Sequence, residues 1–511
     1  MAYAAPGVSA QTPSGPPPAV DKPHRAVEDQ AAKDARRQSS GNLVGHGGPV
    51  KAIDVSAAYS GSCDPIASQR PPREFLRHPL TVTGSFDYSI MGWDLSRGDA
   101  NTIKRIEGHD GAVNAVAILW RRVSSACGGL QPLVASGGDD GIVRVWDFET
   151  GQLLHRLEGH TAKIVSMASG IMLAGDVATA SWDGTARVWD LDKGTAGPVL
   201  RGHRGPVSGV AFVRLAVPIG GTSGIYTATA GADGMILLHD SRHGELQRTV
   251  YRHGWGVNVL TSIPDSRGET EAHLAFGAVN GTAAVIDLAA GLIVKELTPH
   301  DGPVLALAHD PANRLLATGG GDGRIRVYRT GTWQLVAEHH NPYGPVWALA
   351  FHPDGKSLYY GGLDDFVTRW PFVPRAAFEP VESQFPRRFQ ATAGMGLGEQ
   401  QFARKCSVCH TVEPDGANRA GPSLHKIFGR KAGTLVGYPY SDAMKNSAIV
   451  WNEDTVAKLF ELGPDQFTPG SKMPLQKITD AGQRGALIAY LITATGGAPL
   501  KPIAPAQETR P

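Results

Sequence analysis

Apolar and polar side chains alternate in short segments over most of the first 370 residues. The segments 142–146 (IVRVW) and 185–189 (TARVW) are examples, and this period of two predicts half-buried β-strands. Beyond residue 394 the period changes, and apolar residues at helical spacing predict helices over 398–405, 454–462 and 480–492. Asn452 or Asp454 is expected to cap the middle helix. The pattern therefore predicts a β region followed by a smaller α region.

The β region is built from repeats. Seven dipeptides, four of which begin with Trp, recur at spacings of 53, 43, 50, 47, 42 and 42 residues. These spacings match or slightly exceed the ~40–45 residues expected of one propeller blade. The dipeptides are Trp93-Asp94, Trp146-Asp147, Trp189-Asp190, His239-Asp240, Ile286-Asp287, Tyr328-Arg329 and Trp370-Pro371.

Three further positions keep register with these dipeptides. An acidic or amide residue stands six residues before each dipeptide, at Asp87, Asp140, Asp183, Asp233, Asn280, Asp322 and Asp364. Four residues earlier stand Thr83, Ser136, Thr179, Thr229, Phe276, Thr318 and Tyr360. Upstream lies a histidine, at His46, His109, His160, His203, His253, His300 and, in the seventh unit, His340. Histidine, hydroxyl, carboxylate and indole can form one buried hydrogen-bond chain in each unit. The repeat explains these histidines better than metal binding does.

These residues resemble the WD-repeat family over residues 41–371. The resemblance implies an all-β, seven-bladed propeller of four-stranded blades. It also implies that the segment 41–44 pairs with the last blade and closes the ring. Blade 5 departs most from the family pattern, at Phe276, Asn280 and Ile286, so its hydrogen-bond chain is expected to be lost.

Composition restricts the class of partner. The chain has 49 Lys and Arg against 48 Asp and Glu, which gives no reason to expect a nucleic-acid partner. No apolar run approaches the ~20 residues of a membrane span, so no transmembrane segment is expected. Four cysteines are too few for a disulfide scaffold.

Two of the cysteines, Cys63 and Cys127, lie in long insertions between the first and second strands of adjacent blades. Loops of one class project from the same face of a propeller, so a Cys63–Cys127 disulfide is expected in an oxidising compartment. The alternative is two free thiols in unrelated loops.

The other two cysteines follow a Pro-containing linker at 372–393 and form Cys406-Ser407-Val408-Cys409-His410. C-x-x-C-H is the attachment signature of c-type haem. A zinc site would need a second ligand pair, and no further cysteine follows; a redox dithiol would not need His410. Met473, in a Gly- and Pro-flanked loop 63 residues after His410, is a candidate second axial ligand.

The segments GEQQFARKCSVCHTV, GPSLHKIFGRKAG, GYPYSDAMKN and TPGSKMP closely resemble class I cytochrome c of the mitochondrial-like branch, an all-α domain expected at 394–497. The resemblance implies one covalently bound haem c, with thioether bonds to Cys406 and Cys409 and with His410 and Met473 on the iron. It places the Pro422 carbonyl on the His410 ring. Residues expected at a haem propionate are Arg430, Tyr440, Trp451 and Ser471. Phe460 and Met444 depart from the family pattern.

Location follows from the resemblance, because such haem domains are assembled outside the bacterial cytoplasm. We therefore expect a periplasmic protein whose signal peptide is not part of this sequence. Small-residue patterns occur at 2–4 and 8–10, but no apolar segment precedes them. Residues 1–40 are rich in Ala, Pro and Ser and are expected to be disordered, and 498–511 is expected to be a flexible tail.

Two functions remain open at this point. The first is an electron carrier, not itself an enzyme, whose propeller is the docking platform for a redox partner protein. The second is a haem oxidoreductase that acts on a small molecule at the propeller channel. The candidate residues for the second are those that the repeat leaves unexplained: His239, His243, His339 and His340.

Overall fold

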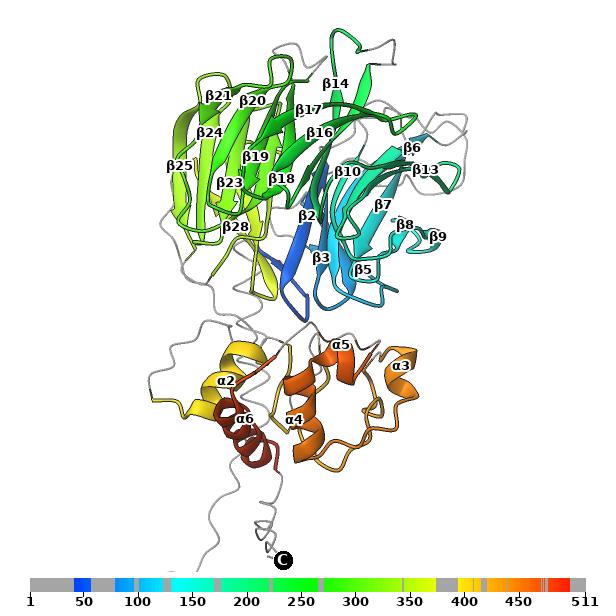
Figure 1. Cartoon of the computed structure of the whole chain (residues 1–511), viewed down its shortest axis with the longest axis vertical. Coiled ribbons are helices and arrows are strands. Elements are labelled where there is room, and N and C mark those ends of the chain that lie inside the picture. The colour runs from blue at the N-terminus through cyan, green and yellow to red at the C-terminus, as the bar shows by residue number, and fades with distance from the viewer. Residues whose placement is uncertain are drawn as a thin grey trace, which may run out of the picture.

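The computed structural model describes residues 41–56, 79–95, 101–122, 130–169, 176–219, 224–264, 271–341, 344–373, 394–407, 409–414, 421–438, 440–469, 471, 473 and 477–496. A large β body stands above a smaller helical body (Figure 1). The expected disulfide Cys63–Cys127, the segment 1–40, most of the linker and the tail 498–511 lie outside the described residues.

The β body is a ring of seven four-stranded antiparallel sheets, as the repeats predict. The strands of blades 1 to 3 are β2 (Val50–Ser56), β3 (Leu80–Ser85), β4 (Ser89–Asp94), β5 (Asn101–Glu107), β6 (Val113–Arg122), β7 (Leu130–Gly138), β8 (Val143–Asp147), β9 (Leu153–Leu157), β10 (Ile164–Ser169), β11 (Asp176–Ser181), β12 (Ala186–Asp190) and β13 (Thr195–Leu200). Those of blades 4 to 6 are β14 (Val207–Arg214), β15 (Ile225–Gly231), β16 (Met235–Asp240), β17 (Leu246–Arg252), β18 (Val257–Pro264), β19 (Glu271–Ala278), β20 (Ala283–Asp287), β21 (Ile293–Glu296), β22 (Val304–Asp310), β23 (Leu315–Gly320), β24 (Arg324–Arg329) and β25 (Gln334–His340).

Blade 7 closes the ring with strands from both ends of the propeller. It consists of β26 (Ala348–Phe351), β27 (Ser357–Gly361), β28 (Phe366–Pro371) and β1 (Leu43–Val44). Leu43 pairs with Val367, and the backbone N–H of Arg369 donates to the side-chain carbonyl of Asn42 at 2.8 Å. The expected pairing of 41–44 with the last blade is confirmed, and it removes an open sheet edge.

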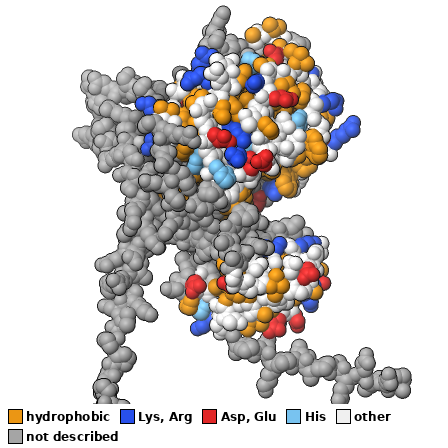
Figure 2. Space-filling model, turned by 90° about the vertical axis from the view of Figure 1, so that its left-hand side faces the viewer, with side chains coloured by type: hydrophobic (Ala, Val, Ile, Leu, Met, Phe, Trp, Pro, Cys, Tyr) orange, Lys and Arg blue, Asp and Glu red, His pale blue; other side chains and the backbone are white. Residues whose placement is uncertain are grey.

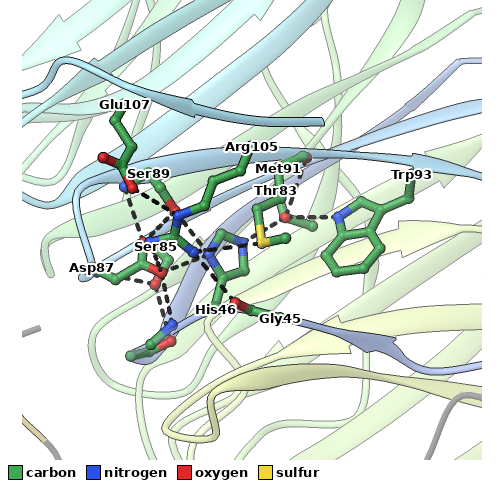
Figure 3. A network of polar contacts seen from close by, with 12 residues as sticks. Gly45, His46, Thr83, Ser85, Asp87, Ser89, Met91, Trp93, Arg105 and Glu107 are labelled. Carbon is green, nitrogen blue, oxygen red and sulfur yellow. Dashed lines mark hydrogen bonds and ion pairs between the residues drawn. The ribbon is translucent and has the colours of Figure 1, made fainter. Parts of the chain in front are cut away.

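Each regular blade contains the expected hydrogen-bond chain, which Figure 3 shows for blade 1. The Trp93 indole N–H donates to the Thr83 hydroxyl at 2.9 Å, and this hydroxyl lies 2.7 Å from Nε2 of His46. Nδ1 of His46 lies 3.1 Å from an oxygen of Asp87. The chain satisfies side chains that are almost fully buried, so it ties the end of each blade to its turn.

Four blades modify this chain. In blade 4, His239 stands at the Trp position, with Nε2 at 3.2 Å from the Thr229 hydroxyl. Blade 5 has lost the chain, as expected: His253 packs edge-on against Phe276 and reaches only Asn280, at 3.3 Å. In blade 6, Tyr328 stands at the Trp position, while His300 keeps its contacts with Asp322 and Thr318, at 3.0 and 2.9 Å. In blade 7 the expected His340 does not take part, and its neighbour His339 stands in its place.

The seventh histidine of the repeat is His339 and not His340. His339 is buried, stacks on Trp370 at 5.0 Å and reaches the Tyr360 hydroxyl at 3.3 Å, whereas His340 is exposed. Successive side chains of a strand point to opposite faces, so only one of two adjacent histidines on β25 can face the core.

The helical body contains α2 (Leu397–Lys405), α3 (Asp442–Lys445), α4 (Glu453–Leu462), α5 (Pro464–Phe467) and α6 (Ala481–Ala494). Asn452 caps α4 in a capping box with Thr455. The two terminal helices cross where Gly398 allows close approach, since a Cβ there would lie 2.0 Å from the Ala486 carbonyl oxygen. The crossing is completed by the rings of Phe402 and Tyr490, 5.5 Å apart.

Candidate functional site: the haem cavity

The C-x-x-C-H segment forms a tight turn at the end of α2. The Cys409 and His410 backbone N–H groups donate to the Cys406 carbonyl, at 3.0 and 2.8 Å. Cys406 is buried, and this burial raises the pKa of its thiol to about 12. A redox dithiol needs an accessible thiolate with a lowered pKa, so the structure disfavours that alternative.

The ring of His410 is held by the segment that follows. Its Nδ1–H donates to the Pro422 carbonyl at 2.7 Å, as the sequence resemblance implies. A carbonyl can only accept, so Nε2 carries the lone pair, which is the form that ligates a metal. Gly421 lies against the same ring, since a Cβ there would lie 2.3 Å from Cε1 of His410.

The opposite wall of the cavity comes from α4 and the loop after α5. Val456, Leu459 and Phe460 present buried apolar side chains. The Thr468 hydroxyl donates to the Ser471 hydroxyl at 3.1 Å, which fixes the loop just before Met473. The partly buried Met473 packs against this apolar cluster.

A polar corner completes the cavity. The Arg430 guanidinium donates to the carbonyls of Ser423 and His425, at 2.7 and 3.1 Å. Burial lowers the pKa of Arg430, so a carboxylate brought beside it would offset the cost of the buried cation. Trp451 is fixed by reciprocal backbone bonds to Gly429 and Arg430.

All of the residues that the resemblance assigns to the haem line this one cavity. They are Cys406, Cys409, His410, Pro422, Arg430, Tyr440, Trp451, Ser471 and Met473. Two thiols, an imidazole, a thioether, a cation and apolar walls are the donor set that a covalently attached haem with His and Met ligands requires. Met444 lines the cavity as well.

The propeller also contributes to this wall, which the sequence did not predict. Phe86, Tyr88, Ala112 and Asp139 line the same cavity from blades 1 and 2. The signal that could have found them is at Tyr88: blades 2 to 6 have glycine at the equivalent position after the repeat aspartate.

The histidines proposed for small-molecule chemistry are not brought together. His239 and His339 belong to the hydrogen-bond chains of blades 4 and 7, and His243 lies 3.1 Å from Asp240 in an exposed turn. Within the described ranges, no group of three His, Cys, Asp or Glu side chains is arranged to hold a metal ion.

A second cavity of about 520 Å³ lies at the end of the propeller channel where the first and second strands of the blades connect. Asp54 accepts the Ile118 backbone N–H there at 2.7 Å, and burial raises the pKa of the Asp54 carboxyl. Burial likewise lowers the pKa of His309 to about 4, so this histidine is neutral at pH 7.

Comparison with known proteins agrees with both halves. The family model described as "WD domain, G-beta repeat" matches residues 100–147, 151–190, 291–329 and 333–370, and the "Cytochrome c" model matches 396–495. The crystal structure of the WD40 β-propeller domain of Doa1 superposes with a TM-score of 0.50 and 20% identity, over 65% of this chain and 95% of that one. At that identity the likeness shows the fold alone.

Cytochromes c from a fungus and a plant resemble the C-terminal domain along nearly their whole length. That of Gibberella zeae is 45% identical over 98 residues, which is 19% of this chain and 92% of the relative. That of Nigella damascena is 41% identical over 107 residues, 21% of this chain and 96% of the relative. The fold and the cavity thus define a WD-repeat propeller fused to an electron-transfer haem domain.

Through that C-terminal domain the chain belongs to the cytochrome c family, which implies a covalently bound haem c. Among the described residues, no helix has the length and apolarity needed to cross a membrane.

Proposed function

We propose that this protein is a one-electron carrier whose haem c is held by Cys406, Cys409, His410 and Met473, and whose propeller docks a redox partner protein. The observation that carries the proposal is the convergence of all the expected haem residues on one cavity. When bound, the haem supplies reversible one-electron chemistry between Fe(III) and Fe(II).

The protein's own side chains bind, orient and enclose that group. Pro422 orients the His410 ring through its carbonyl, and Gly421 lets the chain pass against the ring. Phe460, Leu459 and Val456 exclude water from the opposite face. Arg430 provides a partly buried positive charge for a carboxylate. His410 and Met473 would both hold the metal of a bound haem, which would suit the site to electron transfer rather than to binding a substrate.

Exposed aromatic side chains at one end of the propeller support the docking proposal. The turns between second and third strands and the connections between blades lie at one end of the propeller, and at this end the turn between β3 and β4 lines the haem cavity. At this end Trp182 is 51% and Trp255 is 61% exposed. Exposed tryptophans are typical anchors of protein interfaces.

Charge plays a smaller part in this docking. Residues 391–500 carry eleven Lys and Arg against nine Asp and Glu. Figure 2 shows both signs distributed over the visible face of the helical body. Long-range attraction to an acidic partner is therefore weak, and contact residues rather than net charge select the partner.

The compartment is part of the proposal. A haem attached through two cysteine thiols supports a location outside the cytoplasm, which we propose to be the bacterial periplasm. Fractionation of the source cells checks this: the haem protein is expected with the periplasmic contents, and recovery in the cytoplasmic fraction contradicts it.

The haem assignment is tested with two methionines that line the same cavity. Wild-type protein is expected to show one low-spin haem per chain and a weak charge-transfer absorption from the Met-to-iron bond. Met473→Ala abolishes this absorption because it removes the thioether ligand, while Met444→Ala is the matched control and retains it. Survival of the band in Met473→Ala would assign the ligand to another residue.

Docking is tested by electron transfer from the reduced full chain to an extract of the source cells. Replacing Trp182 and Trp255 by serine is expected to slow transfer about tenfold, since each such anchor contributes more than ~1 kcal/mol to binding. The control is Val217→Ser, which changes a 78% exposed side chain in a turn at the opposite end of the propeller. Equal rates in all three proteins would exclude this docking face.

A further inference from the structure

One turn of the propeller reaches the haem cavity. The turn between β3 and β4 carries Phe86 and Tyr88, which line the cavity together with Cys409 and Tyr438. Tyr88 is only 8% exposed, and its hydroxyl is hydrogen-bonded to the hydroxyl of Tyr438 in the cytochrome domain. The side chain therefore lies between the two domains, at the edge of the haem site.

Tyr88 occupies a backbone position that is glycine in blades 2 to 6. Its φ is +67°, in the left-handed region that disfavours residues with a Cβ. The equivalent residues of blades 2 to 6 have φ between +70° and +88°, and all are glycine: Gly141, Gly184, Gly234, Gly281 and Gly323. The turn of blade 1 thus has a strained backbone at the residue that carries a large aromatic side chain. Backbone strain of this kind concentrates at functional sites.

The blade holds this turn in place from beneath. Asp87, the residue before Tyr88, binds His46, Ser89 and the Gly47 backbone N–H, at 3.1, 2.6 and 2.7 Å (Figure 3). Arg105 adds an ion pair at 3.2 Å. Burial would raise the pKa of the Asp87 carboxyl, but His46 and Arg105 bring it below its usual range. The backbone next to Tyr88 is consequently fixed by the hydrogen bonds and the ion pair of Asp87.

The junction itself is built from turns. In the described part of the chain, the extensive packing is of helix on helix and of strand on strand. Phe86 extends the contact towards the channel, because its ring lies 5.8 Å from that of Trp347. Junctions of this limited kind between domains commonly open and close.

We propose that Tyr88 is the residue with which the propeller closes the mouth of the haem cavity in its own chain, so that the propeller controls access to the haem edge. This inference rests on the proposed function, since it requires a haem in the cavity. It adds that a redox partner meets the haem at a surface made of both domains. Tyr88 is a positioning residue: it acts by covering the haem edge and by anchoring Tyr438.

Tyr88→Gly in the full-length haem protein tests this directly. Glycine is the residue of blades 2 to 6 at this position, so the variant keeps the propeller fold and removes the backbone strain. The protein is reduced with ascorbate and mixed rapidly with ferricyanide, which takes one electron from the haem. Oxidation of Tyr88→Gly is expected to be about tenfold faster than that of wild type, because the cavity mouth is uncovered.

A second readout does not depend on electron transfer. Amide hydrogen exchange over residues 432–438 is expected to accelerate in Tyr88→Gly, because this segment loses its contact with the propeller. Unchanged oxidation and unchanged exchange would overturn the proposal.

Two further variants separate the effect of the Tyr88 side chain from a general effect of a glycine substitution. Arg314→Gly also replaces a residue with positive φ, +56°, but in an exposed turn at the other end of the propeller, and it should leave both readouts unchanged. Tyr88→Phe keeps the ring and loses the hydroxyl bond to Tyr438. It is expected to speed oxidation two- to threefold, and an unchanged rate in this variant counts against the role of the hydroxyl pair. A wild-type spectrum without haem would instead contradict the proposed function.

Discussion

The histidines of the propeller and the histidine of the cytochrome domain are held by different kinds of partner. In blade 3, Nδ1 of His160 lies 2.7 Å from Asp183 and Nε2 lies 2.8 Å from the Thr179 hydroxyl, so protein groups engage both ring nitrogens. The His410 ring gives its Nδ1–H to the Pro422 carbonyl and lines the haem cavity. The same residue type is a structural element in one region and the proposed metal ligand in the other, and the difference lies in what faces Nε2: a hydroxyl in the blade and the haem cavity in the cytochrome domain.

The surroundings of a blade histidine also affect the charge of its imidazole. A carboxylate beside Nδ1 would usually raise the pKa of an imidazole. At His160, however, burial prevails and lowers the pKa, with Asp183 opposing it. Burial lowers the pKa of His109 in blade 2 in the same way, so in these two blades a neutral imidazole links the Trp-bonded hydroxyl to the carboxylate.

The largest expected difference between the two kinds of histidine is spectroscopic. His410→Ala removes the proximal ligand, and we expect complete loss of the low-spin haem spectrum. His425→Ala is the control within the same domain, because His425 lies near Arg430 but does not line the cavity. Equal spectra in the two variants would show that His410 is not the ligand.

The next difference is in stability. His160→Ala leaves a buried carboxylate and a hydroxyl without their partner, which is expected to cost the propeller about 2–4 kcal/mol. The haem spectrum should remain unchanged. Urea unfolding followed by tryptophan fluorescence measures the loss.

The matched control for that loss is His253→Ala in blade 5. Its ring has Asn280 as a polar contact and otherwise packs on Phe276, so a loss of about 1 kcal/mol is expected. A loss at His253 as large as at His160 would break the comparison between complete and incomplete hydrogen-bond chains.

The smallest expected effect is on the pH dependence of stability. Burial lowers the pKa of His239 to about 4, below the ordinary 6.5, so between these values the unfolded chain binds a proton that the folded blade does not. Stability therefore falls as pH decreases below 6.5. Between pH 7 and 5.5 this group is expected to cost about 1 kcal/mol. Thermal unfolding of His239→Gln should show a correspondingly smaller loss of stability over this pH range than wild type shows. An equal loss in the two proteins would show that His239 does not cause the pH dependence.

The regular parts of the fold could be predicted from the sequence because the same residue types recur at equivalent positions of successive blades. The Trp, Asp, hydroxyl and His positions recur, so the blades and their order follow. Cys406, Cys409 and His410 follow from a motif with fixed spacing, and the other haem residues follow from the resemblance to cytochrome c. The adjacent histidines at 339 and 340 could not be separated in this way. Both lie near the expected place, and the pairing register of β25 decides which one faces the core.

The junction between the domains could not be predicted for a different reason. Contacts such as Tyr88 with Tyr438 depend on how two separately folded bodies meet, and neither hydrophobic period nor motif spacing carries that information. The short helices α3 and α5, of four residues each, were missed as well, because one helical turn has too few residues to show a period.

The pairing of β1 with β28 determines when the propeller ring can close during synthesis of the chain. These strands join residues 43–44 to 366–367, so the first blade edge to leave the ribosome waits for its partner until the rest of the propeller has been made. The cytochrome domain follows directly behind β28 along the chain. Completion of the ring and appearance of the two haem-binding thiols are therefore neighbouring events in biosynthesis. The surface that comes to cover the haem edge is assembled just before the haem domain itself emerges.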